Sequence, residues 1–580
     1  MEKMYINLVH RAENDPALME SVKFQQEECH RLGLKVTLLI GYPAMCNPEI
    51  AAYVKKEGER DDVELGISFH DISNSELKEI AGTAEPVLYL MELEARKRVI
   101  DKIFEKFRQE FGYVPASVGG YIVDAATLSY IKEKYPSVKA AITNCFEEGI
   151  KMFAGNCNGW VLFSDGGPWG ASYPSRENHL MPARDREDYV GIVGLPHLNR
   201  DMVLSLVSRD DYFASHPINV MRAKACHSAE SSYMYYFFDQ WAEQVKKNGY
   251  GYYNVFVSAA WITKGFQTLF VDNYLDARKM YSDALLYYKE NCEKGIAECT
   301  TMSEFADWYE GHVQVGAPEV NLWKEILCGT GRQCFWYVDP YYRMAFDMNQ
   351  GGTIIDVRPY AHHLDNTMGP DTEVLYDGSN PFIISQEHRN TEAFCSLTYK
   401  GQRVSVKDQR TFAETGKDKN GCPTLEVEPM RFTIQGVELV LHSRFTFLEG
   451  GKIRMERCVE GLPEGESAEL TEEFRGCYGK NQYPENLNGI VLHVKGAEEK
   501  ELTYCYQGRA LQTAVSGEGE AVAKAAIPQI RTAVSLIAES CAARAEVLEG
   551  VLFSPFYTLK MEGTVKNKEA MITCLKIEEQ

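Results

Sequence analysis

A histidine followed by an aspartate closes the apolar run VELGISFHDI at residues 63–72. Where a strand meets a loop, His70 and Asp71 could be metal ligands, an acid/base pair or a solvated strand end. An imidazole beside a carboxylate can hold or transfer a proton near neutral pH. Residues that could act with this pair are expected at the ends of the other apolar runs.

Polar side chains follow several of those runs. His10 ends MYINLVH, and His197 and Asp201 follow DYVGIVGLPH. Asp124 ends ASVGGYIVD, where it is either a catalytic carboxylate or the N-cap of a helix beginning AATL. Glu147 follows VKAAIT in the segment ITNCFEEG, either as a functional carboxylate or as a solvated loop charge. Each of these residues is a candidate for the same site.

The segment NGWVLFSDGGPWGASYPSREN, residues 158–178, is long for a loop in a compact domain. Its aromatic content argues against disorder, and long ordered loops are usually functional. Trp169 and Tyr173 could contact the C–H faces of sugar rings, while Arg176 and Asn178 could bind hydroxyl groups. The alternative is a loop buried against another part of the chain.

These candidates need elements that bring them together, and the first half of the chain supplies a pattern for this. Helical periodicities separate the apolar runs, which predicts parallel strands in a (β/α) barrel. The seven predicted strands are residues 4–10, 34–41, 62–70, 116–123, 138–143, 188–197 and 252–261. In such barrels the working residues lie at the carboxyl ends of the strands, so the candidates should share one rim.

The second half changes character from about residue 326. Short β-type runs recur between glycine and proline turns, and the segment IQGVELVLHSRFTFLEGGKIRMERCV predicts a three-strand meander. We expect an α/β plus all-β chain: an irregular seven-stranded (β/α) barrel followed by an antiparallel β-sandwich. The predicted boundaries are a barrel at 1–290, a helical linker at 291–325 and a sandwich at 326–580.

Composition limits the function classes. The formal net charge of -22 argues against nucleic acid and anionic membrane surfaces as partners. The N-terminus lacks the pattern of a signal peptide, and no apolar run is long enough to cross a membrane. The 16 cysteines are scattered without a C-x-x-C pair, which favours reduced thiols in a cytoplasmic protein. The oligomeric state is left open, homo-oligomers included.

The strand order and one short motif carry a resemblance to a known group. Glu64, Gly66 and His70 match the Glu-x-Gly and histidine of the third strand in the polysaccharide deacetylase (NodB-like) superfamily. The predicted barrel, over residues 4–290, also resembles that of glycoside hydrolase families 57 and 38, whose members often carry a β-rich domain. The resemblance implies a carbohydrate-active enzyme, and family 57 enzymes place a catalytic carboxylate near the strand end that Asp124 occupies.

The chain departs from the deacetylase pattern at the metal site. His10 stands where an aspartate is expected, and no second histidine lies within a helical turn of His70. Zinc needs about three protein ligands, so we expect no cofactor. The alternative is a metal such as zinc held by His10, His70 and another carboxylate.

The sequence therefore predicts a glycoside hydrolase acting on a small saccharide or glycoside. Asp124, paired with Asp71 or Glu147, would be the acid and the nucleophile or base. His10 and His70 would bind sugar hydroxyls. The alternatives are a metal-dependent carbohydrate deacetylase and a non-catalytic sugar-binding protein.

Overall fold

The computed structural model divides the chain into two compact units near residue 317. It describes all residues except 1, 71, 84–86, 121, 145–166, 200, 204–230, 264–273, 326–328, 361–368, 371–380, 386–389, 479–486, 506–511, 519–520, 540–541 and 551–555. The first unit is built on one sheet and the second on two.

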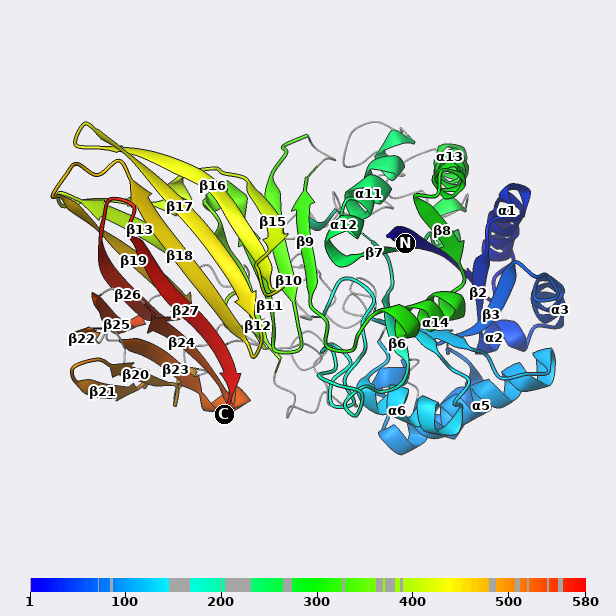
Figure 1. Cartoon of the computed structure of the whole chain (residues 1–580). Coiled ribbons are helices and arrows are strands. Elements are labelled where there is room, and N and C mark those ends of the chain that lie inside the picture. The colour runs from blue at the N-terminus through cyan, green and yellow to red at the C-terminus, as the bar shows by residue number, and fades with distance from the viewer. Residues whose placement is uncertain are drawn as a thin grey trace. The chain divides into compact units, whose positions relative to one another are not determined.

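A parallel sheet forms the centre of the first unit (Figure 1). Its strands are β1 (Lys3–Ala12), β2 (Val36–Gly41), β3 (Val63–Ser68), β4 (Ser117–Gly119), β5 (Ala140–Asn144), β6 (Val193–Pro196) and β7 (Tyr250–Phe256). They are ordered β6-β5-β4-β3-β2-β1-β7, so the sheet curves as an open barrel with β6 and β7 as its end strands. All seven predicted strands are present, and the predicted fold class is confirmed.

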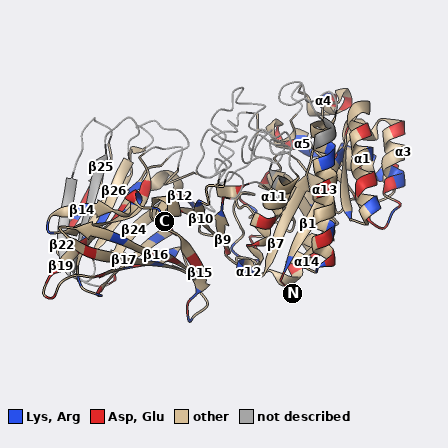
Figure 2. Ribbon diagram, turned by 90° about the horizontal axis from the view of Figure 1, so that it is seen from above, with Lys and Arg blue, Asp and Glu red and all other residues tan. Residues whose placement is uncertain are grey.

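Helices cover the outer face of this sheet. They are α1 (Pro16–Leu32), α2 (Tyr42–Met45), α3 (Pro48–Glu57), α4 (Ser75–Ala81), α5 (Leu93–Phe111), α6 (Ala125–Lys134), α11 (Ser232–Ala242), α12 (Val245–Asn248) and α13 (Tyr274–Glu293). Helix α1 begins after the N-cap Asp15 and ends at Gly33, whose φ of 63° is left-handed. Figure 2 shows charged residues on α1 and α3, whereas β7 carries none. No described helix is both long and apolar enough to span a membrane.

One further strand and helix close the bottom of the barrel. Strand β8 (Ala297–Thr300) pairs with β1, and helix α14 (Met302–His312) follows it. Phe305 of α14 packs against Tyr5 and Tyr252, with ring centroids 5.5 and 4.5 Å apart. The carboxylate of Glu64 accepts a hydrogen bond from the backbone N–H of Ser303 at 3.0 Å. The predicted helical linker was residues 291–325; the first unit continues through Ala317, so residues 291–317 of that stretch belong to it.

The second unit consists of two antiparallel sheets that stack as a sandwich (Figure 1). One sheet has the order β22-β25-β26-β19-β13-β12-β11-β10-β9, with β14 beside β13; the other has the order β15-β16-β17-β18-β27-β24-β23-β20-β21. Their bounds are β9 (Glu319–Lys324), β10 (Gln333–Val338), β11 (Tyr342–Asp347), β12 (Thr353–Pro359), β13 (Glu392–Tyr399), β14 (Gln402–Ser405), β15 (Ala413–Lys417), β16 (Pro423–Ile434), β17 (Val437–Leu448), β18 (Lys452–Glu460), β19 (Ser467–Gly476), β20 (Val491–Lys495), β21 (Glu499–Thr503), β22 (Gln512–Glu518), β23 (Val522–Ile527), β24 (Thr532–Ala538), β25 (Ala542–Gly550), β26 (Phe556–Lys566) and β27 (Ala570–Glu579).

The predicted meander is the hairpin series β16-β17-β18. Gln435 and Gly436 form its first turn with φ values of 51° and 77°, as a two-residue hairpin turn requires. Phe445 and Phe447 of β17 point into the sandwich, where they meet Phe346 of the facing sheet at centroid distances of 4.9 and 6.1 Å. This aromatic layer forms part of the core of the second unit.

Candidate functional site at the carboxyl rim of the barrel

Four side chains from four strand ends meet at the carboxyl rim of the first unit. The imidazole rings of His70 and His197 lie 5.4 Å apart between centroids. Phe256 lies 4.2 Å from the ring of His197, and the guanidinium of Arg11 lies 5.1 Å over the ring of Phe256. These residues end or follow β3, β6, β7 and β1, so the parallel sheet brings together positions far apart in the sequence. We call this group the rim cluster.

Burial sets the charge of the rim cluster. Burial lowers the pKa of His70 well below its usual value, and the nearby Arg11 and His197 lower it further. His70 is therefore neutral at physiological pH. Its Nδ1 lies 3.1 Å from the hydroxyl oxygen of Ser68, and Arg11 forms an ion pair with Glu13 at 3.0 Å. The arrangement provides imidazole nitrogens and a cation in a site largely removed from water.

His10 lies on the other face of β1. Its Nδ1 accepts a hydrogen bond from the side-chain amide of Gln26 at 2.9 Å, so Nε2 carries the proton and donates to the hydroxyl of Tyr281 at 2.7 Å. These partners belong to α1 and α13. The expectation that His10 and His70 share a pocket is thus corrected: successive strand residues point to opposite faces, and Arg11 is the inward one.

Asp124 is fully buried and both its carboxylate oxygens are engaged. One oxygen accepts from the backbone N–H of Thr127 at 2.9 Å, which caps helix α6. The other forms an ion pair with Arg96 at 2.7 Å, and neither side chain is exposed. The N-cap interpretation is confirmed, whereas a catalytic role for Asp124 stays a prediction.

Of the other predicted carboxylates, the structure describes Asp201 but not Asp71 or Glu147. Asp201 is 2% exposed and lies five residues after the end of β6 at Pro196. Asp71 and Glu147 lie outside the described residues, so their predicted roles stay predictions. Within the described ranges, no group of three or more histidine, cysteine, aspartate or glutamate side chains is arranged to hold a metal ion.

The segment after residue 167 is a packed structural element. Tyr173 donates hydrogen bonds to the carbonyl oxygens of Tyr309, on helix α14, and of Val313, directly after it. Trp169 is 3% exposed, and the guanidinium of Arg176 binds the carbonyl of Glu187. The side chain of Asn178 accepts from the backbone N–H of Leu180 in a local turn. For Tyr173 and Arg176 in particular, these contacts favour packing over the predicted contact with a ligand.

Sequence reasoning overlooked two parts of the site, Arg11 and Phe256, because the direction in which their side chains point depends on strand register. Side chains alternate between the two faces of a strand, so once His10 is assigned to the helix-covered face, Arg11 is expected to point inward. His179 is another buried histidine: burial lowers its pKa to about 4, although the nearby Asp124 acts in the opposite direction.

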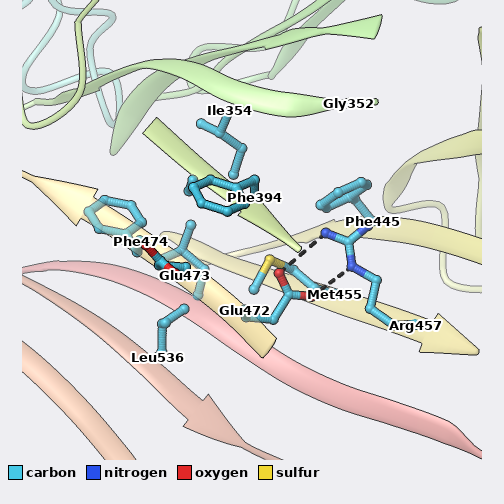
Figure 3. Close-up of a pocket in the computed structure, with 12 residues that line it drawn as sticks. Gly352, Ile354, Phe394, Phe445, Met455, Arg457, Glu472, Glu473, Phe474 and Leu536 are labelled. Atoms are coloured by element: carbon cyan, nitrogen blue, oxygen red, sulfur yellow. Dashed lines mark hydrogen bonds and ion pairs between the residues drawn. The ribbon is translucent and has the colours of Figure 1, made fainter. Parts of the chain in front are cut away.

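The second unit contains a separate cavity between its two sheets. Its apolar lining includes Ile354, Phe474 and Met455. In Figure 3 the guanidinium of Arg457 faces the carboxylate of Glu472, and the two are joined by a hydrogen bond of 2.6 Å. This ion pair links strands β18 and β19, which belong to opposing sheets, so it stabilises the packing of the two sheets.

The protein thus consists of an open (β/α) barrel, which carries the rim cluster, and a β-sandwich. Residues 4–321 match the family described as "Domain of Unknown Function with solved-structure structure" (DUF3863). This chain belongs to that family. No curated protein sequence matches it.

Several solved structures are similar to parts of the chain. A glycoside hydrolase/deacetylase candidate from Parabacteroides distasonis is 15% identical, with a TM-score of 0.48 over 64% of this chain and 88% of the other. A 4-alpha-glucanotransferase from Thermococcus litoralis is 10% identical, with a TM-score of 0.29 over all of both chains. A galactose mutarotase-like protein from Clostridium acetobutylicum is 9% identical, with a TM-score of 0.29 over 45% of this chain and 99% of the other.

Proposed function

We propose that this protein is a carbohydrate-active hydrolase that works at the carboxyl rim of its barrel. His70 and His197 transfer protons, and Arg11 binds a polar group of the substrate. The observation that carries the proposal is the pair of imidazole rings 5.4 Å apart beside Phe256 and Arg11. The sugar substrate follows from the sequence resemblance to carbohydrate-active barrels.

The electrostatics of the rim support this chemistry. An imidazole held neutral by burial can take a proton from water or from a substrate hydroxyl without first losing its own. Phe256 is 2% exposed and packs against both the His197 ring and the Arg11 guanidinium, so it helps to fix where these two polar groups lie. Arg11 adds a cation close to that ring, where it can stabilise negative charge that develops during hydrolysis.

Two reactions fit the proposal to different degrees. Glycoside hydrolysis remains the leading candidate, with a carboxylate supplied by Asp71, Glu147 or Asp201. Deacetylation is the second, and one observation favours it: Asp124 is bound to Arg96 and Thr127, so the first predicted member of a carboxylate pair is already engaged. In either reaction a neutral imidazole at the rim would act as the proton acceptor.

The test is an activity panel of chromogenic glycosides and acetylated sugars, with and without a chelator. We expect hydrolysis of at least one member, and a loss of kcat/KM of about 100-fold or more in His70→Gln and in His197→Gln. His312→Gln is the matched control, because His312 is an exposed histidine on helix α14 of the same unit. Activity that survives both rim substitutions would contradict the proposal.

A further inference from the structure

Two asparagines join the end strands of the open barrel. Strands β6 and β7 share no backbone ladder among the described residues. Instead, the side-chain amide of Asn254 on β7 donates to the carbonyl of Pro196 at 2.8 Å. The backbone N–H of Asn254 donates to the Oδ1 of Asn199 at 2.6 Å, and the Nδ2 of Asn199 approaches the carbonyl of Tyr252 at 3.4 Å. We call these three contacts the asparagine clamp.

The partners fix the orientation of both amides. A carbonyl oxygen and a backbone N–H have opposite hydrogen-bonding roles, so Nδ2 of Asn254 must face Pro196 and Oδ1 of Asn199 must face Asn254. Both side chains are 2% exposed. The clamp is therefore directional, and an apolar residue of the same size cannot reproduce it.

The clamp brackets a residue of the rim cluster. His197 lies between Pro196 and Asn199, the two positions that Asn254 holds. Phe256 lies two residues after Asn254, on the same face of β7. The clamp thus fixes the backbone on both sides of His197 and sets the distance between its ring and that of Phe256, 4.2 Å.

Asn254 does not suit a purely stabilising role. Its Oδ1 is buried and has no hydrogen-bond partner among the described residues. A buried acceptor without a partner is destabilising. Asn254 therefore holds the end of β6 in place even though its own unbonded oxygen reduces the stability of the fold. This combination favours a role in positioning β6 over a role in stability.

We propose that Asn199 and Asn254 are positioning residues that hold the His197 imidazole in its working place. The inference rests on the proposed function, because it assigns the clamp to a histidine that transfers protons. A histidine displaced by about an ångström is poorly aligned with the atom it must protonate, which lowers turnover steeply. The clamp acts through His197 and does not itself touch the reacting atoms.

The test uses substitutions that remove or keep single parts of the clamp in the full-length chain. Asn254→Leu removes the donor to Pro196, and Asn199→Leu removes the acceptor for Asn254. Asn199→Asp keeps that acceptor and removes only the longer contact of Nδ2 with the carbonyl of Tyr252. Asn291→Leu is the matched control: Asn291 is buried in α13 of the same unit, and its amide donates to the carbonyl of Tyr287 at 2.8 Å.

Two readouts separate positioning from stability. The first is the ¹⁵N spectrum of the histidine rings, with the His197 signals assigned from their loss in His197→Gln. The second is kcat and KM on any substrate that the glycoside and acetylated-sugar panel identifies. We expect Asn254→Leu and Asn199→Leu to move the His197 signals and to lower kcat about 10- to 100-fold with little change in KM. Asn199→Asp should retain most of the turnover, and Asn291→Leu should leave the His197 signals unmoved.

The outcomes distinguish this inference from the proposed function. Unmoved His197 signals in Asn254→Leu and Asn199→Leu would overturn the inference, whether or not the enzyme hydrolyses a sugar. Moved signals in a protein that hydrolyses none of the panel would support the clamp and count against the proposed function. Equal losses of turnover in Asn199→Asp and Asn199→Leu would also overturn it, because the retained acceptor would then have no effect.

Discussion

At the level of single residues, burial determines which histidines carry charge. His10 and His70 both lie where water cannot stabilise an imidazolium, so both are neutral near pH 7. For His10, burial lowers the pKa to about 3, with a smaller effect from His30. His10 forms hydrogen bonds with residues of helices α1 and α13, whereas His70 belongs to the rim cluster. The same physical cause therefore serves stability at one position and, in our proposal, catalysis at the other.

The low pKa of His10 predicts an acid-sensitive fold. The unfolded state binds a proton at His10 below about pH 6.5, while the folded state does so only near pH 3. The contribution of His10 to stability is thus complete above pH 6.5 and is lost as the pH falls from 6.5 towards 3. His10→Gln retains an acceptor and a donor without this titration.

Urea denaturation between pH 6 and pH 4 measures the effect. In His10→Gln the free energy of unfolding should fall less steeply with decreasing pH than in the wild type, by up to about 1.4 kcal/mol per pH unit. Tyr281→Phe is a useful control, because it removes the hydrogen-bond partner of His10 and leaves the histidine itself in place. Equal slopes in His10→Gln and the wild type would show that His10 is not held neutral.

At the level of elements, the ion pair of Arg96 with Asp124 ties α5 to the start of α6. Arg96 also donates to the carbonyl oxygens of Tyr89 and Met91, so it anchors the chain before α5 as well. Removing one partner of a fully buried ion pair leaves the other charge uncompensated. We expect Arg96→Met to destabilise the protein by about 3–5 kcal/mol.

A second substitution tests this explanation. Asp124→Asn keeps an oxygen that can cap α6 but removes the charge, so the double variant with Arg96→Met should recover much of the lost stability. Thermal and urea unfolding of the two single variants and the double variant provide the comparison. Additive losses in the double variant would contradict the ion-pair explanation. Loss of hydrolysis in a stable Asp124→Asn variant would support the predicted catalytic role of Asp124.

The elements also show which features a sequence can predict. The seven barrel strands could be recognised because each is an apolar run and helices with clear end signals separate them. Helix α1, between β1 and β2, has its N-cap at Asp15 and its C-cap at Gly33. Strand β8 is only four residues long and reads AECT, without apolar periodicity, so nothing local indicates it. Strand β24, with the sequence TAVSLIA, pairs with β23 on one side and β27 on the other, so partners distant in the sequence complete it.

At the level of the whole molecule, the site was harder to predict than the fold. The rim itself follows from parallel strands, and His70 and His197 were both selected on that ground. The inward residue of each strand depends on register, which is why His10 was chosen in place of Arg11. The clamp depends on contacts between residues about 55 positions apart, which no local pattern reveals.

The most direct test of the central claim is to locate a bound saccharide. The measurement is a crystal structure of the His197→Gln variant soaked with the substrate that the activity panel identifies. The account predicts density for the sugar beside His70 and Phe256, with Arg11 within hydrogen-bonding distance. Density confined to the β-sandwich unit, with no sugar at the barrel rim, would contradict it.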